Sequence, residues 1–184
     1  SLNKGDKLSN AKVIARMDCD DISHPDRLKK QVGYMLKHPD TALLGSGFTK
    51  INKHGRKLYR IEMPFISLVI RWKMLFFNCF AHPTIMLNKD KLIQHKLNYG
   101  VSPDDDHFKN IDIKGVGDED YLLFAILSNL EETNNLKESL LYYREHEGQL
   151  TNINKSFLFN QKDIIVQNIL IKMFNDSEEE ININ

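Results

Sequence analysis

The sequence is poor in cysteine and has no excess of charge of either sign. Cys19 and Cys79 are the two cysteines among 184 residues, and 25 Lys and Arg balance 25 Asp and Glu. Two distant cysteines make no disulfide framework, and no Cys-x-x-Cys or Cys/His spacing indicates zinc. The charge balance disfavours nucleic-acid binding driven by overall charge, so we expect no nucleic-acid partner. A reducing, cytoplasmic location is the expectation.

A signal peptide and a long uninterrupted apolar run are also missing. The most apolar window, residues 63–83, contains Arg71 and Lys73, so it predicts an amphipathic helix over about 65–78 instead of a membrane span. The simpler interpretation buries its apolar face against a sheet, with Trp72, Phe76 and Phe77 in the core. Peripheral association with the inner face of a membrane is the alternative.

The chain is long enough for one domain with a sizeable core, and its pattern alternates between strands and helices. Helices are expected over residues 1–10, 25–37, 65–78, 89–95, 120–130 and 156–174. Strands are expected over residues 12–17, 42–51, 57–61, 84–87 and 138–144, with a surface loop at 98–117. The alternation predicts an α/β fold.

Three carboxylates, those of Asp18, Asp20 and Asp21, occupy four positions at the start of the stretch MDCDDISHPDRL, residues 17–28, at the end of the apolar run VIARM. Such carboxylates repel one another and raise each other's pKa unless a positive charge compensates. A strand that ends in Asp-x-Asp delivers Asp18 and Asp20 to the carboxyl edge of a sheet, where open α/β sheets bind ligands. Two carboxylates suit a hard cation such as Mg²⁺ or Mn²⁺. A solvated acidic turn is the alternative.

From Leu2 to Thr151 the sequence resembles the family 2 glycosyltransferases of the GT-A fold. The resemblance is carried by these blocks in order: LNKG with VIARMDCDDISHPDRLKKQVGYMLKHPDTALLGS, AHPTIML (81–87), GDEDYLLF (117–124) and LLYYREHEGQLT (140–151). It implies an α/β, GT-A-like (Rossmann-like) mixed sheet flanked by helices over residues 1–151. Residues 152–184 are expected to form a C-terminal helix and an acidic tail.

The family's first nucleotide-binding strands have no counterpart in this sequence, which starts at Ser1 without a Met. We therefore expect an amino-terminally truncated domain, a piece of something longer. Without those strands, sheet edges would be unpaired and apolar faces exposed.

The resemblance implies a metal site at the acidic cluster. Asp20 matches the aspartate that coordinates Mn²⁺ or Mg²⁺ bridging the diphosphate of the donor, and Asp18 matches the one near the ribose and the metal's water shell. His146 matches a histidine that completes the metal or diphosphate site in many relatives. Asp21 is expected to support the site by bonding to the backbone or to Arg27, and both are counted with Asp18 as candidate substrate-binding residues.

A catalytic base is implied at the start of the helix over 120–130. Asp120 matches the family's base, which takes the proton of the acceptor hydroxyl, and Glu119 is its neighbour. Successive helical residues point about 100° apart, so only one of the two faces the substrate, and we favour Asp120. The alternative is a pair of acids that complements the helix dipole.

The HPT segment, His82, Pro83 and Thr84, matches the strand that borders the acceptor site. His82 either lines the acceptor pocket or is a histidine at the edge of the core bonded to backbone, and both interpretations remain open. Arg144 pairs with an acidic neighbour or with a phosphate, and the sequence does not distinguish the two.

These residues predict an inverting, metal-dependent glycosyltransferase. It would move a sugar from a nucleotide-diphosphate sugar, most simply a UDP-sugar, to a hydroxyl of a saccharide or lipid-linked acceptor in surface polysaccharide or glycolipid synthesis. A divalent metal neutralises the leaving diphosphate, and a positioned carboxylate activates the hydroxyl. One alternative is a non-catalytic remnant or interaction module of that fold. Another is a haloacid-dehalogenase-like phosphatase, whose strand also ends in Asp-x-Asp.

Overall fold

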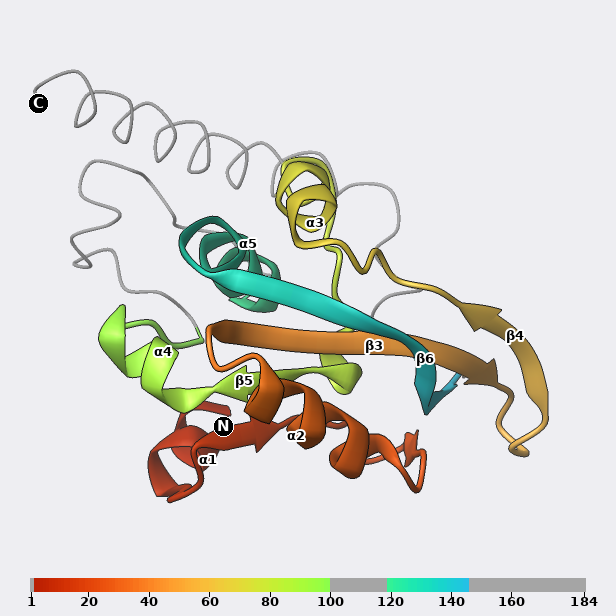
Figure 1. Cartoon of the computed structure of the whole chain (residues 1–184). Coiled ribbons are helices and arrows are strands. Elements are labelled where there is room, and N and C mark those ends of the chain that lie inside the picture. Colours follow the sequence, from red (N-terminus) through yellow and green to blue (C-terminus); the bar gives the residue numbers. More distant parts are fainter. Residues whose placement is uncertain (1, 100–118, 146–184) are drawn as a thin grey trace, which may run out of the picture.

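A computed structural model describes residues 2–99 and 119–145 of the chain (Figure 1). The helices are α1 (Leu2–Leu8), α2 (Arg27–Lys37), α3 (Ser67–Lys73), α4 (Lys89–Gln94) and α5 (Glu119–Leu130), with a 3-10 turn η1 (His82–Thr84). The strands are β1 (Val13–Ala15), β2 (Ile22–Ser23), β3 (Thr41–Ile51), β4 (Lys57–Ile61), β5 (Met86–Asn88) and β6 (Glu132–Arg144).

The strands of the described residues form one mixed sheet with the order β1-β5-β3-β6-β2, and β4 pairs with β3. The long strands β3 and β6 run parallel at its centre, and every other pair is antiparallel. Helices flank both faces, with α3 and α5 on one and α2 on the other (Figure 1). This architecture agrees with the expected GT-A-like fold.

The two faces of the sheet bury different residues because side chains alternate along a strand. Leu43 and Leu87 belong to the larger apolar cluster, which contains most of α5. Their neighbours Leu44 and Met86 turn to the opposite face and pack with Met35 of α2. Residues 121–127 of α5 are all buried, so this helix is apolar around its whole circumference, as expected for a helix enclosed by other elements.

At the edge of this sheet, β1 pairs with β5 alone among the described strands.

Two sequence expectations about strands need correction. β6 begins at Glu132, six residues before the predicted start, because its polar first half pairs in parallel with β3 from Thr41 onward. Residues 82–84 form the turn η1 instead of leading into a strand, and β5 begins at Met86.

The helix predicted over 65–78 is shorter, and its aromatic residues are not in the core. α3 ends at Lys73 and buries Ile70, while Met74 is buried just after it. The side chains of Trp72, Phe76 and Phe77 are 63%, 60% and 45% exposed, so their predicted burial was wrong. Two turns of helix present only the residues four apart to α5, and the others point away from it.

The predicted helices over 1–10, 25–37, 89–95 and 120–130 are confirmed in type, with small differences at their ends. Pro25 precedes α2, which begins at Arg27. The loop at 98–117 and the helix over 156–174 fall largely or wholly outside the described residues.

Candidate functional site

The acidic cluster forms a turn between two strands. The backbone N–H of Arg16, just after β1, donates to the carbonyl of Ile85 at 3.1 Å, and β2 pairs Ile22 with Tyr142 of β6. Between these anchors the N–H of Asp21 donates to the carbonyl of Asp18 at 3.4 Å. We call residues 18–21 the acidic turn.

Arg16 supplies a positive charge to the acidic turn. Its guanidinium holds both carboxylate oxygens of Asp18, at 2.6 and 2.7 Å. This fork-to-fork geometry is the stronger kind of charged hydrogen bond, although Asp18 is 39% exposed and solvent weakens the pair. Sequence reasoning missed Arg16. The available signal was its position two residues before Asp18, which puts both side chains on one side of an extended segment.

Asp21 is a supporting residue that bonds to the backbone, as predicted. Its Oδ1 accepts the N–H of Arg144 at 2.9 Å, while its Oδ2 is buried without a hydrogen-bond partner. Burial raises the pKa of Asp21 to about 6 against the opposing Arg144 hydrogen bond, and the charges of Asp20 and Asp18 raise it further.

The Arg144 side chain ties the acidic turn to the β3–β4 hairpin. Its Nε donates to the carbonyl of Asp20 at 2.9 Å, and its Nη1 donates to the carbonyls of Asn52 and Lys53 at 3.3 and 3.0 Å. These contacts of the Arg144 side chain are with backbone carbonyls.

Arg27, a candidate substrate-binding residue, is buried and bonds to the backbone. It is 2% exposed, and its Nη2 donates to the carbonyls of Arg16 and Ile85 at 2.7 and 3.1 Å. Its Nε donates to Gln31 at 2.9 Å. Burial lowers the pKa of the guanidinium to about 10. Arg27 therefore positions the end of β1 beside the segment after η1.

Pro83 and Thr84 of η1, two further candidate substrate-binding residues, are also buried. The Thr84 hydroxyl donates to the carbonyl of Ala81 at 2.8 Å and accepts the N–H of Ser46 at 3.2 Å. Its backbone carbonyl accepts Gln31 at 2.8 Å. These bonds fix η1 against β3 and α2, and η1 carries His82.

His82 brings the HPT segment and the start of α5 together. Its Nδ1 lies 3.5 Å from Oδ2 of Asp120, and its Nε2 lies 3.3 Å from the hydroxyl of Tyr99. Burial, with a contribution from Arg16, lowers the pKa of His82 to about 3, so the imidazole is neutral. These contacts of His82 are with side chains. The side chain of Asp120 beside it is 25% exposed.

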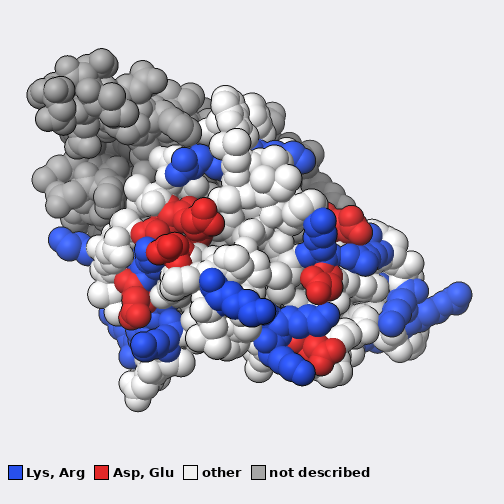
Figure 2. All heavy atoms as spheres, in the orientation of Figure 1, with Lys and Arg blue, Asp and Glu red and all other residues white. Residues whose placement is uncertain are grey.

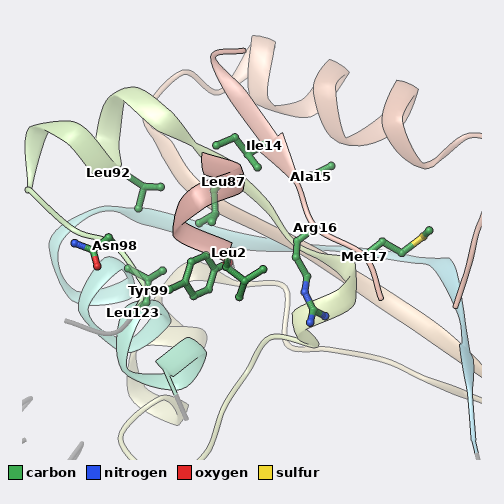
Figure 3. A pocket seen from close by; sticks show the side chains of 11 residues that line it. Leu2, Ile14, Ala15, Arg16, Met17, Leu87, Leu92, Asn98, Tyr99 and Leu123 are labelled. Carbon is green, nitrogen blue, oxygen red and sulfur yellow. The ribbon is translucent and has the colours of Figure 1, made fainter. Parts of the chain in front are cut away.

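A cavity of about 360 Å³ adjoins this group (Figure 3). Most of its lining is apolar, contributed by Leu2, Ile14, Ala15, Met17, Leu87, Leu92 and Leu123. Figure 3 shows Arg16 and Met17 at one end and Leu92 and Asn98 at the other. The carboxylates of the acidic turn do not line it, so the cavity neighbours the candidate site through Arg16 and Tyr99 and is distinct from it.

The order and spacing of these elements agree with one family. Residues 1–106, which include the acidic turn and η1, match the model for "Glycosyl transferase family 2". The chain belongs to glycosyl transferase family 2. The resemblance seen in the sequence is thereby confirmed, and the interpretation as a dehalogenase-like phosphatase is set aside.

Two relatives of this family 2 chain show the kind of protein it is similar to. The O-antigen biosynthesis glycosyltransferase WbnJ of Escherichia coli is 36% identical over 137 residues, which are 73% of this chain and 48% of the relative. The amylovoran biosynthesis glycosyltransferase AmsE of Erwinia amylovora is 34% identical over 93 residues, 50% of this chain and 35% of the relative. The chain thus spans half or less of the length of these relatives.

Of the three remaining predicted residues of the family 2 site, the structure describes two. Asp20 is half-buried in the acidic turn, Glu119 is the first residue of α5, and His146 lies outside the described residues. Within residues 2–99 and 119–145, no three His, Cys, Asp or Glu side chains converge on a point where they could hold a metal ion. In the same part of the chain, no helix is long and apolar enough to cross a membrane.

Proposed function

We propose that this family 2 protein transfers a sugar, with inversion, from a nucleotide-diphosphate sugar to a hydroxyl acceptor. The observation that carries the proposal is that η1 lies between Asp120 and the segment before the acidic turn: His82 of η1 is 3.5 Å from Asp120, and the N–H of Arg16 donates to the carbonyl of Ile85, directly after η1. His82 contacts Asp120, and Arg16, which grips Asp18, is close enough to lower the pKa of His82. A candidate base and a candidate donor site are therefore neighbours.

Asp120 acts as the base in this proposal. A sugar hydroxyl is a weak nucleophile at neutral pH, and a carboxylate within hydrogen-bond reach removes its proton as it attacks. The new bond forms at the anomeric carbon while the bond to the diphosphate oxygen breaks on the opposite side. A single displacement of this kind inverts the anomeric configuration.

Asp18 and Asp20 would hold a divalent cation, Mn²⁺ or Mg²⁺, in the same proposal. The donor set fits a hard ion, since it consists of carboxylate oxygens, and Oδ2 of Asp21 on the same turn is buried without a hydrogen-bond donor. When bound, the cation supplies positive charge that offsets the charge of the departing diphosphate. Arg16 already engages both oxygens of Asp18, so Asp20 is the main ligand and Asp18 is shared with Arg16.

The donor is most simply a UDP-sugar, and the acceptor is a saccharide or a lipid-linked saccharide of a surface polysaccharide or glycolipid. Two relatives are named as glycosyltransferases of O-antigen biosynthesis and of amylovoran biosynthesis, which supports this class of product.

The test is release of UDP from UDP-glucose, UDP-galactose and UDP-N-acetylglucosamine by the whole protein with Mn²⁺. Asp20→Asn and Asp120→Asn should each lose at least about 100-fold in turnover, because each removes a charged group that acts in the transition state. The exposed Asp90→Asn is the control for loss of one negative charge. Turnover by Asp120→Asn at the level of the unmodified protein would overturn the assignment of the base. No UDP release with any donor would favour a non-catalytic module.

We also propose peripheral association with an anionic membrane through the exposed face of α3. Leu68, Trp72 and Phe76 are each 60% exposed or more. Lys137 lies 4.0 Å from the ring centre of Phe65, and Lys73 lies 5.9 Å from that of Phe77. Figure 2 shows this uncharged surface flanked by basic side chains. Aromatic rings beside lysines are typical of surfaces that bind the membrane interface.

Co-sedimentation with vesicles of phosphatidylglycerol and phosphatidylethanolamine tests this association. The double variant Trp72→Ser, Phe76→Ser should remain in the supernatant, while Ile93→Ser on α4, an equally exposed apolar residue, should sediment like the unmodified protein. Equal sedimentation of both variants would contradict a role for α3.

A further inference from the structure

A chain of polar contacts links Asn3 of α1 to Asp120 through Tyr99 and His82. The Oδ1 of Asn3 accepts the backbone N–H of Tyr99 at 3.0 Å, and its Nδ2 donates to the carbonyl of Tyr99 at 2.6 Å. Asn3 therefore clamps the backbone of Tyr99 from both sides. The Tyr99 hydroxyl in turn reaches Nε2 of His82, and Nδ1 of His82 reaches Asp120.

The rings in this chain are fixed by packing. Tyr99 is 7% exposed, and its ring centre lies 5.5 Å from that of His82. On the other side, Phe124 of α5 meets the imidazole edge to face at 5.6 Å. The imidazole therefore has little freedom to rotate away from Asp120.

The protonation state of His82 follows from the groups that face it. Asp120 favours the charged imidazolium, while Arg16 from the end of β1 and burial disfavour it, and burial is the largest effect. The pKa of His82 falls to about 3, so the ring is neutral at physiological pH. A neutral imidazole has one N–H and one lone pair.

The partners decide where the single proton sits. An ionised carboxylate can only accept, so the N–H is at Nδ1, facing Asp120. The lone pair is then at Nε2, where the Tyr99 hydroxyl can donate. Each group has a defined direction of donation, from Tyr99 to His82 to Asp120.

We propose that His82 is a positioning residue that, held by Tyr99, orients the Asp120 carboxylate through an Nδ1–H donor. This inference rests on the proposed role of Asp120 as the base. The His82–Asp120 separation of 3.5 Å is long for a hydrogen bond, and such contacts commonly tighten when a substrate closes the site. With one oxygen held by a donor, the plane of the carboxylate is set relative to the acceptor hydroxyl.

Substitutions that place an amide nitrogen at the position of Nδ1 or of Nε2 test the direction of hydrogen-bond donation from Tyr99 to His82 to Asp120. The amide of Asn places an N–H near the position of Nδ1, and the amide of Gln reaches the position of Nε2. In UDP release and transfer assays, His82→Asn should keep most of the kcat. His82→Gln and His82→Ala should lose about 10- to 100-fold in kcat with little change in the KM for the donor.

The pH profile of kcat/KM distinguishes a role of His82 in orienting the Asp120 carboxylate from a role in packing alone. Loss of the Nδ1–H donor destabilises the Asp120 carboxylate, so the acidic limb of kcat/KM should move to higher pH in His82→Gln and stay in place in His82→Asn. His95→Asn, which removes the Nε2 contact of another histidine with the carboxylate of Glu131, and Tyr121→Phe, whose hydroxyl bonds to Met74, are controls that should leave the limb unchanged. Equal kcat and equal limbs in His82→Asn and His82→Gln would overturn the inference.

Nitrogen-15 NMR of the histidine side chains tests the same inference without any assay of activity. His82 should show the neutral Nδ1–H tautomer from pH 5 to 8, and Tyr99→Phe, which removes a single oxygen atom, should convert it to a mixture of tautomers. A charged His82 at pH 6, or the Nε2–H tautomer, would overturn the proposal. Failure of the base assignment is separate, because it would show as an active Asp120→Asn.

Discussion

Asp21 offers the sharpest test of the electrostatics of the acidic turn. Its carboxylate is buried, one oxygen has no hydrogen-bond donor, and burial raises its pKa from 3.8 to about 6. The native state therefore holds the Asp21 proton more tightly than the unfolded state does. As the pH rises from about 4 to above 6, the unfolded state releases its proton first, and the free energy of unfolding falls.

The size of this effect follows from the two pKa values. Each unit is worth about 1.4 kcal/mol, so the ionised Asp21 makes the protein about 3 kcal/mol less stable once both states have lost the proton. Asp21→Asn removes the titration. Its amide still accepts from Arg144 through Oδ1, and any cost of burying its NH₂ is the same at every pH.

The pH dependence isolates the titration from this constant cost. In urea unfolding of the whole protein, the stability of Asp21→Asn relative to the unmodified protein should rise by about 2–3 kcal/mol between pH 4 and pH 7.5. Asp26→Asn, an exposed residue before α2, controls for removal of one negative charge. The same stability difference at both pH values would refute the reasoning, because a constant difference means that Asp21 does not titrate as a buried acid.

Other substitutions give separate tests by thermal or urea unfolding. Gly45→Ala should destabilise by about 2–3 kcal/mol, since its Cβ would meet Oδ1 of Asn135 at 2.1 Å. In contrast, Gly33→Ala in α2 has open space and should stabilise by about 0.5–1 kcal/mol; a loss there would contradict the packing. Arg27→Met should cost about 3 kcal/mol or more, because two buried carbonyls lose their donor. Mn²⁺ with UDP should raise the melting temperature of the unmodified protein and not that of Asp20→Asn, and an equal rise would exclude Asp20 as a ligand.

Most helices and strands could be predicted because apolar spacing and turn residues within each segment indicate them. Apolar spacing placed α5, and the hairpin of β3 and β4 followed from two strand patterns around a turn at residues 52–55. The first half of β6 escaped prediction because its residues, ETNNLK, are polar, and they form a strand through pairing with β3. Such pairing is a tertiary effect that propensity does not report.

The sequence motifs of the candidate site could be predicted, but the contacts between its side chains could not. The family motifs identified Asp18, Asp20 and Asp120 as candidates. The Arg16–Asp18 pair and the Tyr99–His82 contact depend on how β1, η1 and the segment before residue 100 meet, which one sequence does not reveal. The exposure of Trp72 reflects the same limit, because an apolar pattern shows a helix face without showing what it contacts.

The most direct test of the central claim is an anomalous-difference map from crystals of the whole protein grown with Mn²⁺ and UDP. The account predicts a manganese peak within coordination distance of an Asp20 carboxylate oxygen, with the diphosphate of UDP on the side of Asp120. A manganese peak elsewhere, with the acidic turn contacting only water and Arg16, would contradict it.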